Sequence, residues 1–151
     1  MIQIGEKFPE FSLLDQNGRR VGNKELMGNR VVIYFYPKDD TPGCTKESCD
    51  FRDVITDNRS VQIIGVSPDD VNSHKKFSDK YSLNFTLLCD TDHTLAELCG
   101  IWKEKSMFGK RYMGIERTTY QLDENGYVVQ IWNNVNVNGH VSDVLSSITS
   151  S

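Results

Sequence analysis

Two cysteines, Cys44 and Cys49, stand five residues apart in the stretch FYPKDDTPGCTKESCD. Their spacing differs from the CxxC pattern of common redox and zinc pairs. Thr41 and Pro42 come shortly before the first cysteine, and these residue types favour the N-cap and the first position of a helix. The string therefore predicts a helix that begins here, with Cys44 as its third residue.

A thiol at this position has a chemical consequence. The free backbone N–H groups and the positive end of the helix dipole favour a thiolate over a thiol, and a thiolate is the reactive form of cysteine. The apolar run RVVIYFYP at residues 30–37 predicts a buried strand just before the helix. Active sites of α/β proteins lie where such strands end. The alternative is that Cys44 simply packs in the first helical turn.

The distance between the two cysteines restricts how they can pair. On an ideal helix, residues five apart have Cα atoms roughly 8.7 Å apart. A disulfide needs about 4.4–6.8 Å. We therefore expect no permanent bridge while both residues are helical, and any bridge formed in turnover must locally unwind the helix.

Composition narrows the possible classes of function. The 151 residues carry a net charge of −4 with no basic cluster, which argues against nucleic-acid binding. The longest apolar run has only six residues (31–36), far below the roughly 20 that span a bilayer. The start of the chain does not resemble a signal peptide. We expect one domain over residues 1–151, in a soluble, cytoplasmic protein.

The remaining pattern alternates between strands and helices. We expect a β-hairpin at 8–22, a helical turn at 24–29, strands at 30–37 and 61–68, helices at 41–58, 69–82 and 93–100, a second hairpin at 116–132 and a closing helix at 138–150. Strand–helix–strand units with an antiparallel pair at one edge predict an α/β fold, with a central mixed sheet flanked by helices. A thioredoxin-like fold with an N-terminal hairpin fits this order.

The opening stretch also carries a family resemblance. Pro37, Thr41 and Cys44 stand in the pattern PxxxTxxC, which resembles the active-site motif of the peroxiredoxins. The longer string YFYPKDDTPGCTKESC resembles the bacterioferritin comigratory protein, or peroxiredoxin Q, subfamily. The likeness continues through GEKFPEFSLLDQNG, IIGVSPD, FTLLCDTDHTLAELCGIW, ERTTYQLDENG and GHVSDVL.

The resemblance implies a thiol peroxidase that reduces hydrogen peroxide and organic hydroperoxides. It makes Cys44 the peroxidatic nucleophile, which becomes a sulfenic acid. Arg117 matches the family's active-site arginine and would stabilise the thiolate and bind peroxide oxygens. Thr41 would hydrogen-bond the peroxide or the thiolate, and Pro37 would shield the thiolate from water. Glu47 would orient an arginine.

Cys49 matches the resolving position of the subfamily. The resemblance implies that it forms an intrachain disulfide with Cys44, which thioredoxin then reduces. No cofactor or metal is implied. No cysteine follows Cys99, so we expect no resolving thiol from a C-terminal arm, and a monomer is the simplest arrangement.

Plainer interpretations of the same residues stay open. Arg117 could form a surface ion pair, Thr41 could only cap the helix, and Cys49 could be a passive helix residue. Cys89 and Cys99 fit packing roles better than a back-up thiol or a regulatory disulfide. The histidines and cysteines show no zinc-ligand spacing.

Two rival functions also remain at this stage. One is a redox-sensing or binding module that uses the cysteine pair as a switch. The complete set of Thr41, Cys44 and Arg117 argues against it, because a switch does not need that set. The other is a thioredoxin-type thiol–disulfide oxidoreductase, against which the missing CxxC counts.

Overall fold

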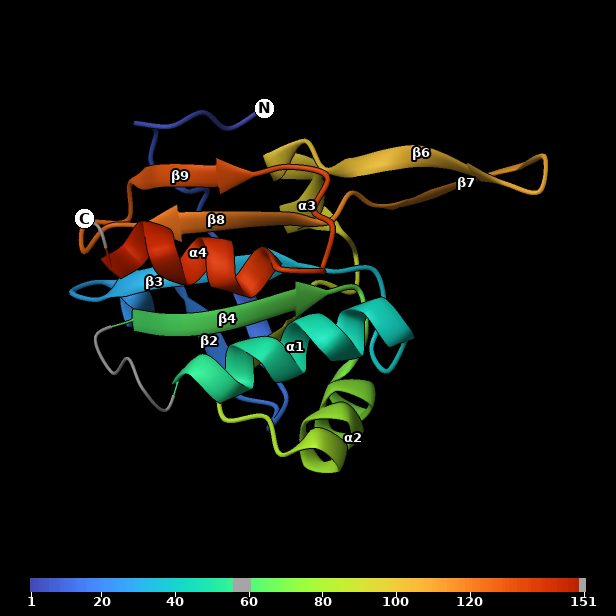
Figure 1. Cartoon of the computed structure of the whole chain (residues 1–151), viewed down its shortest axis with the longest axis horizontal. Helices are drawn as coiled ribbons and strands as arrows, with labels where there is room; N and C mark the ends of the chain where they lie inside the picture. The colour runs from blue at the N-terminus through green and yellow to red at the C-terminus, as the bar shows by residue number, and fades with distance from the viewer. Residues whose placement is uncertain (56–60, 150–151) are drawn as a thin grey trace.

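A mixed seven-stranded sheet forms the centre of the molecule (Figure 1). The computed structural model describes residues 1–55 and 61–149. The strands run in the order β2-β1-β5-β4-β3-β8-β9, and β3, β4 and β5 are parallel while the outer pairings are antiparallel. Their bounds are β1 (Ser12–Asp15), β2 (Arg20–Gly22), β3 (Arg30–Phe35), β4 (Val61–Ser67), β5 (Thr86–Cys89), β8 (Thr118–Leu122) and β9 (Val128–Trp132).

Helices cover both faces of this sheet. They are the 3₁₀ turn η1 (Asn23–Leu26) and the helices α1 (Pro42–Ile55), α2 (Val71–Tyr81), α3 (Thr94–Cys99) and α4 (His140–Thr149). One buried cluster includes residues of α3 and η1, and the other includes residues of α1, α2 and α4. This arrangement confirms the predicted thioredoxin-like α/β fold, both expected hairpins and every expected helix. Residues 56–58 and 150 of the expected helices lie outside the described residues.

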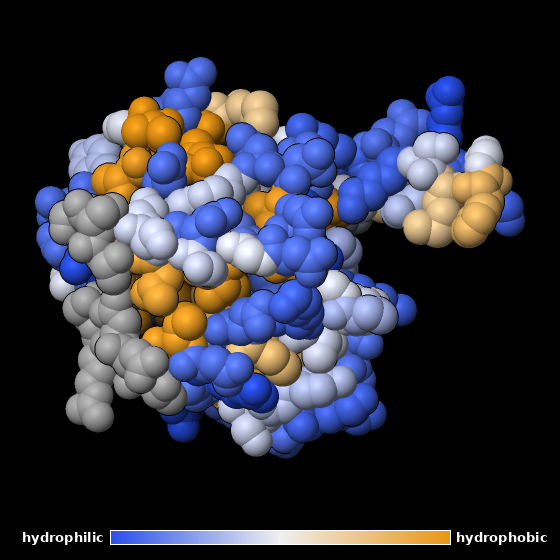
Figure 2. All heavy atoms as spheres, viewed as in Figure 1, coloured by the Kyte–Doolittle hydropathy of each residue, from blue (hydrophilic) through white to orange (hydrophobic). Residues whose placement is uncertain are grey.

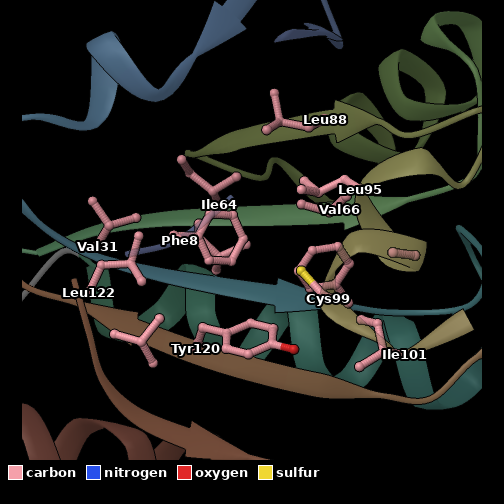
Figure 3. Close-up of a cluster of buried hydrophobic side chains, with 14 of the residues drawn as sticks. Phe8, Val31, Ile64, Val66, Leu88, Leu95, Cys99, Ile101, Tyr120 and Leu122 are labelled. Carbon is pink, nitrogen blue, oxygen red and sulfur yellow. The ribbon is translucent and has the colours of Figure 1, made fainter. Parts of the chain in front are cut away.

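Strand β3 shows why its sequence is apolar throughout. Val31, Ile33 and Phe35 belong to the cluster of Figure 3, whereas Val32 and Tyr34 belong to the cluster on the opposite face. Successive side chains of a strand point to opposite faces, so a strand covered on both sides is apolar at every position. Packing on both faces therefore holds β3 in position, and the chain continues from the end of β3 toward α1.

Three strands were not expected from the sequence. Strand β5 lies between β4 and β1, so antiparallel pairs stand at both edges of the sheet rather than at one. Strands β6 (Trp102–Met107) and β7 (Lys110–Ile115) form a separate two-stranded ribbon that extends away from the body (Figure 1). The tip of this ribbon exposes apolar side chains (Figure 2), and Phe108 is 97% exposed. No described helix has the length and apolar character to cross a membrane.

Tyr34 anchors α1 on the sheet. Its ring stacks on Phe51 with centroids 4.7 Å apart, and its hydroxyl lies 2.7 Å from Oγ of Ser48. The ring has room because Gly65 on β4 has no side chain. A Cβ at Gly65 would lie 2.8 Å from Cδ2 of Leu87 and 2.9 Å from the Tyr34 ring.

We therefore expect Gly65→Ala to destabilise the protein by about 1–3 kcal/mol, because the added methyl group overpacks the core. Urea unfolding measures this change in the free energy of unfolding. Gln62→Ala, at a half-buried position of the same strand, serves as the control and should change stability by less. Equal stability of Gly65→Ala and the unmodified protein would show that the Tyr34 ring moves aside at no cost.

Candidate active site

Cys44 lies where the sequence predicted it. Pro42 is the first residue of α1, so Cys44 is the third, and its side chain is 1% exposed. The backbone N–H of Thr45 donates to the carbonyl of Thr41, which makes Thr41 the residue that precedes the helix. Its hydroxyl does not cap the helix, however, because it donates to the carbonyl of Lys38 at 2.9 Å.

Arg117 contacts the thiol across 73 residues of chain. Its Nη2 lies 3.3 Å from Sγ of Cys44, and its Nη1 donates to Oε1 of Glu47 at 2.8 Å. The sheet creates this contact, because β8 pairs with β3 and Thr118 lies opposite Phe35. Arg117 therefore stands beside the end of β3, where α1 begins. The alternative of a surface ion pair for Arg117 is wrong, since its partner Glu47 is fully buried.

Glu47 is an unusual carboxyl group. Burial raises its pKa from 4.5 to about 7, although the Arg117 guanidinium opposes this shift. Its Oε2 has no hydrogen-bond partner within residues 1–55 and 61–149. The Glu47 carboxyl therefore changes its charge near neutral pH, directly beside the arginine that contacts the thiol.

His140 joins this cluster, which the sequence reasoning missed. Its Nε2 lies 2.8 Å from Oγ1 of Thr119 and 3.8 Å from Oε2 of Glu47. Burial lowers the pKa of His140 from 6.5 to about 4, so the ring is neutral at neutral pH. The position of His140 at the start of an amphipathic helix was the one signal that it is buried.

A cavity of about 360 Å³ lies beside the arginine. It is lined by Pro37, Lys103, Glu104, Lys105, Glu116, Arg117, Asn134 and Val135. Lys103 pairs with Glu116 at 3.1 Å, and burial together with the charge of Arg117 lowers the pKa of Lys105. The structure thus brings Pro37 and Arg117 to one opening, whose volume is within the range of small-molecule sites.

The other cysteines occupy different surroundings. Cys49 is half-buried on the same continuous helix as Cys44, burial raises the pKa of its thiol, and both cysteines are free. Cys99 lies in the core of Figure 3, where burial raises the pKa of its thiol to about 12, and Cys89 is also buried. Packing roles for Cys89 and Cys99 agree with this burial.

Comparison with known proteins identifies the family. Residues 4–131 match the model of the AhpC/TSA family. The chain belongs to this family. It is 46% identical to the peroxiredoxin Bcp of Bacillus subtilis over 149 residues (97% of this chain and 95% of the relative) and 39% identical to that of Escherichia coli strain K12 over 147 residues (96% and 94%).

Solved structures agree with this assignment. A Cys-to-Ser mutant of Xylella fastidiosa PrxQ superposes with a TM-score of 0.93 at 29% identity, covering 99% of this chain and 97% of that one. Xanthomonas campestris peroxiredoxin Q superposes with a TM-score of 0.87 at 42% identity, covering 93% and 90%. The predicted subfamily is therefore confirmed, and the protein is a peroxiredoxin of the bacterioferritin comigratory type, an oxidoreductase with peroxidase activity.

The shifted pKa values of Glu47 and His140 predict opposite pH dependences of stability. The folded state holds the extra Glu47 proton between about pH 4.5 and 7, so this contribution to stability falls as pH rises. The unfolded state holds the extra His140 proton between about pH 4 and 6.5, so that contribution rises with pH. In the shared window the two effects oppose each other.

Glu47→Gln removes only the first effect. The free energy of unfolding of the variant, minus that of the unmodified protein, should increase by roughly 3 kcal/mol from pH 4.5 to 7.5 and then stay level. Urea unfolding at several pH values measures this difference, and Glu10→Gln at an exposed position is the control. A difference that does not change with pH would show that folding leaves the ionisation of Glu47 unaltered.

Proposed function

We propose that the chain reduces hydrogen peroxide and organic hydroperoxides through Cys44. The thiolate attacks the terminal peroxide oxygen, so an S–O bond forms and the O–O bond breaks. The leaving oxygen takes a proton from solvent and departs as water or an alcohol, while Cys44 becomes a sulfenic acid. The contact between Nη2 of Arg117 and Sγ of Cys44, at 3.3 Å, is the observation that carries this proposal.

Four neighbouring residues have separate roles in this reaction. Arg117 stabilises the thiolate and the developing negative charge on the peroxide oxygens. Glu47 holds the guanidinium in place through its 2.8 Å contact. The Thr41 hydroxyl orients the peroxide, and Pro37 at the cavity wall limits access of water to the thiolate. Alkyl peroxide reduction is attributed to the bacterioferritin comigratory protein of Xanthomonas campestris, which supports organic hydroperoxides as substrates.

Cys49 completes the cycle in this proposal. It attacks the sulfenic sulfur of Cys44, water leaves, and an intrachain disulfide forms. Thioredoxin, or a similar dithiol, reduces the disulfide by exchange. The first turns of α1 must open for this step, because both cysteines lie on one helix. We further propose a single-domain, cytoplasmic monomer that needs no cofactor or metal.

Cys44→Ser should reduce peroxide consumption to the background rate, because serine supplies no thiolate at neutral pH. A coupled assay with thioredoxin, thioredoxin reductase and NADPH measures this loss. Cys99→Ala, which removes a buried thiol from the hydrophobic cluster that does not contain Cys44, is the matched control and should keep its activity. Full activity of Cys44→Ser would refute the assignment. One oxidation per chain without turnover in the unmodified protein would favour the redox-switch function instead.

Cys49→Ser should still form one sulfenic acid per chain but turn over at least tenfold more slowly with thioredoxin. Mass spectrometry after one equivalent of peroxide measures the product, and a disulfide between Cys44 and Cys49 is expected in the unmodified protein. Hydrogen exchange should show lower protection of residues 44–49 after oxidation. Unchanged turnover of Cys49→Ser would assign the resolving role to another thiol or show a one-cysteine mechanism.

A further inference from the structure

A second buried charge cluster lies on the loop that joins β3 to α1. Asp39, in this loop, is 7% exposed. Its Oδ1 accepts from the hydroxyl of Tyr36 at 2.5 Å, and its Oδ2 lies 2.8 Å from Oγ of Ser73 and 2.7 Å from Nδ1 of His74. Its backbone N–H donates to Oδ2 of Asp69 at 2.8 Å. Both the side chain and the backbone of Asp39 are therefore held from outside the loop.

His74 supplies the charge that balances Asp39. Its ring is fully buried, and its Nε2 lies 2.8 Å from the carbonyl of Leu88. A carbonyl can only accept, so Nε2 carries a proton, and the facing carboxylate places a second proton on Nδ1. Burial lowers the pKa of His74, but hydrogen bonds and charge interactions with Asp39 and Cys89 together outweigh burial, and the pKa rises to about 10. The His74 ring thus carries a positive charge at neutral pH.

A metal site is a poor account of this cluster. Asp39, Asp69 and His74 offer ligand atoms within 4.8 Å of one another. Both nitrogens of His74, however, already face protein acceptors, and Oδ2 of Asp69 accepts from the hydroxyl of Ser67 at 2.6 Å. The groups satisfy one another, so the cluster is a structural link between the loop and α2.

The next loop residue is held by the other end of α2. Asp40 has φ +58°, in the left-handed region that non-glycine residues rarely adopt. Its carboxylate accepts from Nζ of Lys80 at 2.7 Å and from the hydroxyl of Tyr81 at 2.8 Å. Unfavourable backbone geometry persists only where the surroundings impose it. Helix α2 thus holds two consecutive residues of the loop, and the buried pair at Asp39 is the stronger attachment.

We propose that His74 is a positioning residue of the peroxide reaction. Through Asp39 it fixes the loop that places Pro37 at the cavity wall and Thr41 directly before α1, although His74 itself contacts neither the thiol nor the cavity. This inference rests on the proposed peroxidase function. Two parts of the site then behave differently. The loop stays attached to α2, while α1 opens at residues 44–49 during disulfide formation.

The test compares His74→Gln with Leu83→Ala. The first variant keeps at most one donor toward Asp39 and loses the charge. The second removes a buried apolar side chain just beyond α2, which cannot form a hydrogen bond or ion pair to Asp39, and serves as the stability control. The melting temperature of each variant is measured, and both are assayed well below the lower of the two. Rapid-quench mass spectrometry follows oxidation of Cys44 by hydrogen peroxide, and a second assay follows reduction of the disulfide by dithiothreitol.

We expect His74→Gln to oxidise at least tenfold more slowly than the unmodified protein, and Leu83→Ala to stay within twofold. Disulfide reduction should stay within twofold in both. The pH dependence of Cys44 alkylation by iodoacetamide should not change, because Arg117 and Glu47 stay in place. Ser73→Ala, which removes one hydrogen bond and keeps the ion pair, should slow oxidation about two- to fivefold.

Equal oxidation rates of His74→Gln and Leu83→Ala would overturn the proposal. If His74→Gln does not fold, Ser73→Ala decides, and an unchanged rate in that variant would overturn it. If the unmodified protein does not react with peroxide, the proposed function itself fails, and the role of His74 in that reaction fails with it. If the unmodified protein reacts with peroxide and the variants react equally fast, only the positioning role of His74 fails.

Discussion

The site depends on one partly buried cation, the Arg117 guanidinium. Arg117 is placed where its guanidinium reaches both Sγ of Cys44 and Oε1 of Glu47, and a charge in this position is costly unless it is paired and hydrogen-bonded. The pairing of β8 with β3 brings the arginine to the start of α1, and helical spacing puts Cys44 and Glu47 on one face of that helix. The Arg117 side chain therefore links the sheet, which positions it, to the first turns of α1, which it contacts.

The same burial makes the site sensitive to protons. Glu47 is kept from water by the packing that brings Arg117 to the thiol, so its pKa rises to about 7. The neighbouring ring of His140 is neutral and adds no positive charge. The Arg117 guanidinium thus contacts both Sγ of Cys44 and the Glu47 carboxyl, and the charge of that carboxyl changes near neutral pH.

The sequence predicted the parts of the site that are local or that match the family pattern. Pro42 and Cys44 could be placed because helix starts follow from adjacent residues, and Arg117 because of the motif around it. Asp39 and His74 are 35 residues apart in the sequence, and Thr119 and His140 are 21 residues apart. No local sequence pattern therefore predicts these two contacts. Strands β6 and β7 were missed because their ribbon is mostly exposed, which removes the alternation that identifies a strand.

In the proposed cycle, helix α1 must hold Cys44 in place for the reaction with peroxide and must open for the disulfide with Cys49. The contacts that anchor it are distributed accordingly. Its middle is fixed to the sheet by Ser48 and Phe51, which contact Tyr34, and the loop before it is fixed to α2 by Asp39. The segment between the loop and Ser48 contains Cys44, whereas the half-buried Cys49 lies between Ser48 and Phe51 in the anchored middle. A buried ion pair is a weak source of net stability, but it defines one geometry, since any other arrangement leaves a charge unpaired. Charge pairs at Arg117 and at Asp39 therefore suit the proposed cycle, in which the helix opens and returns to the same place.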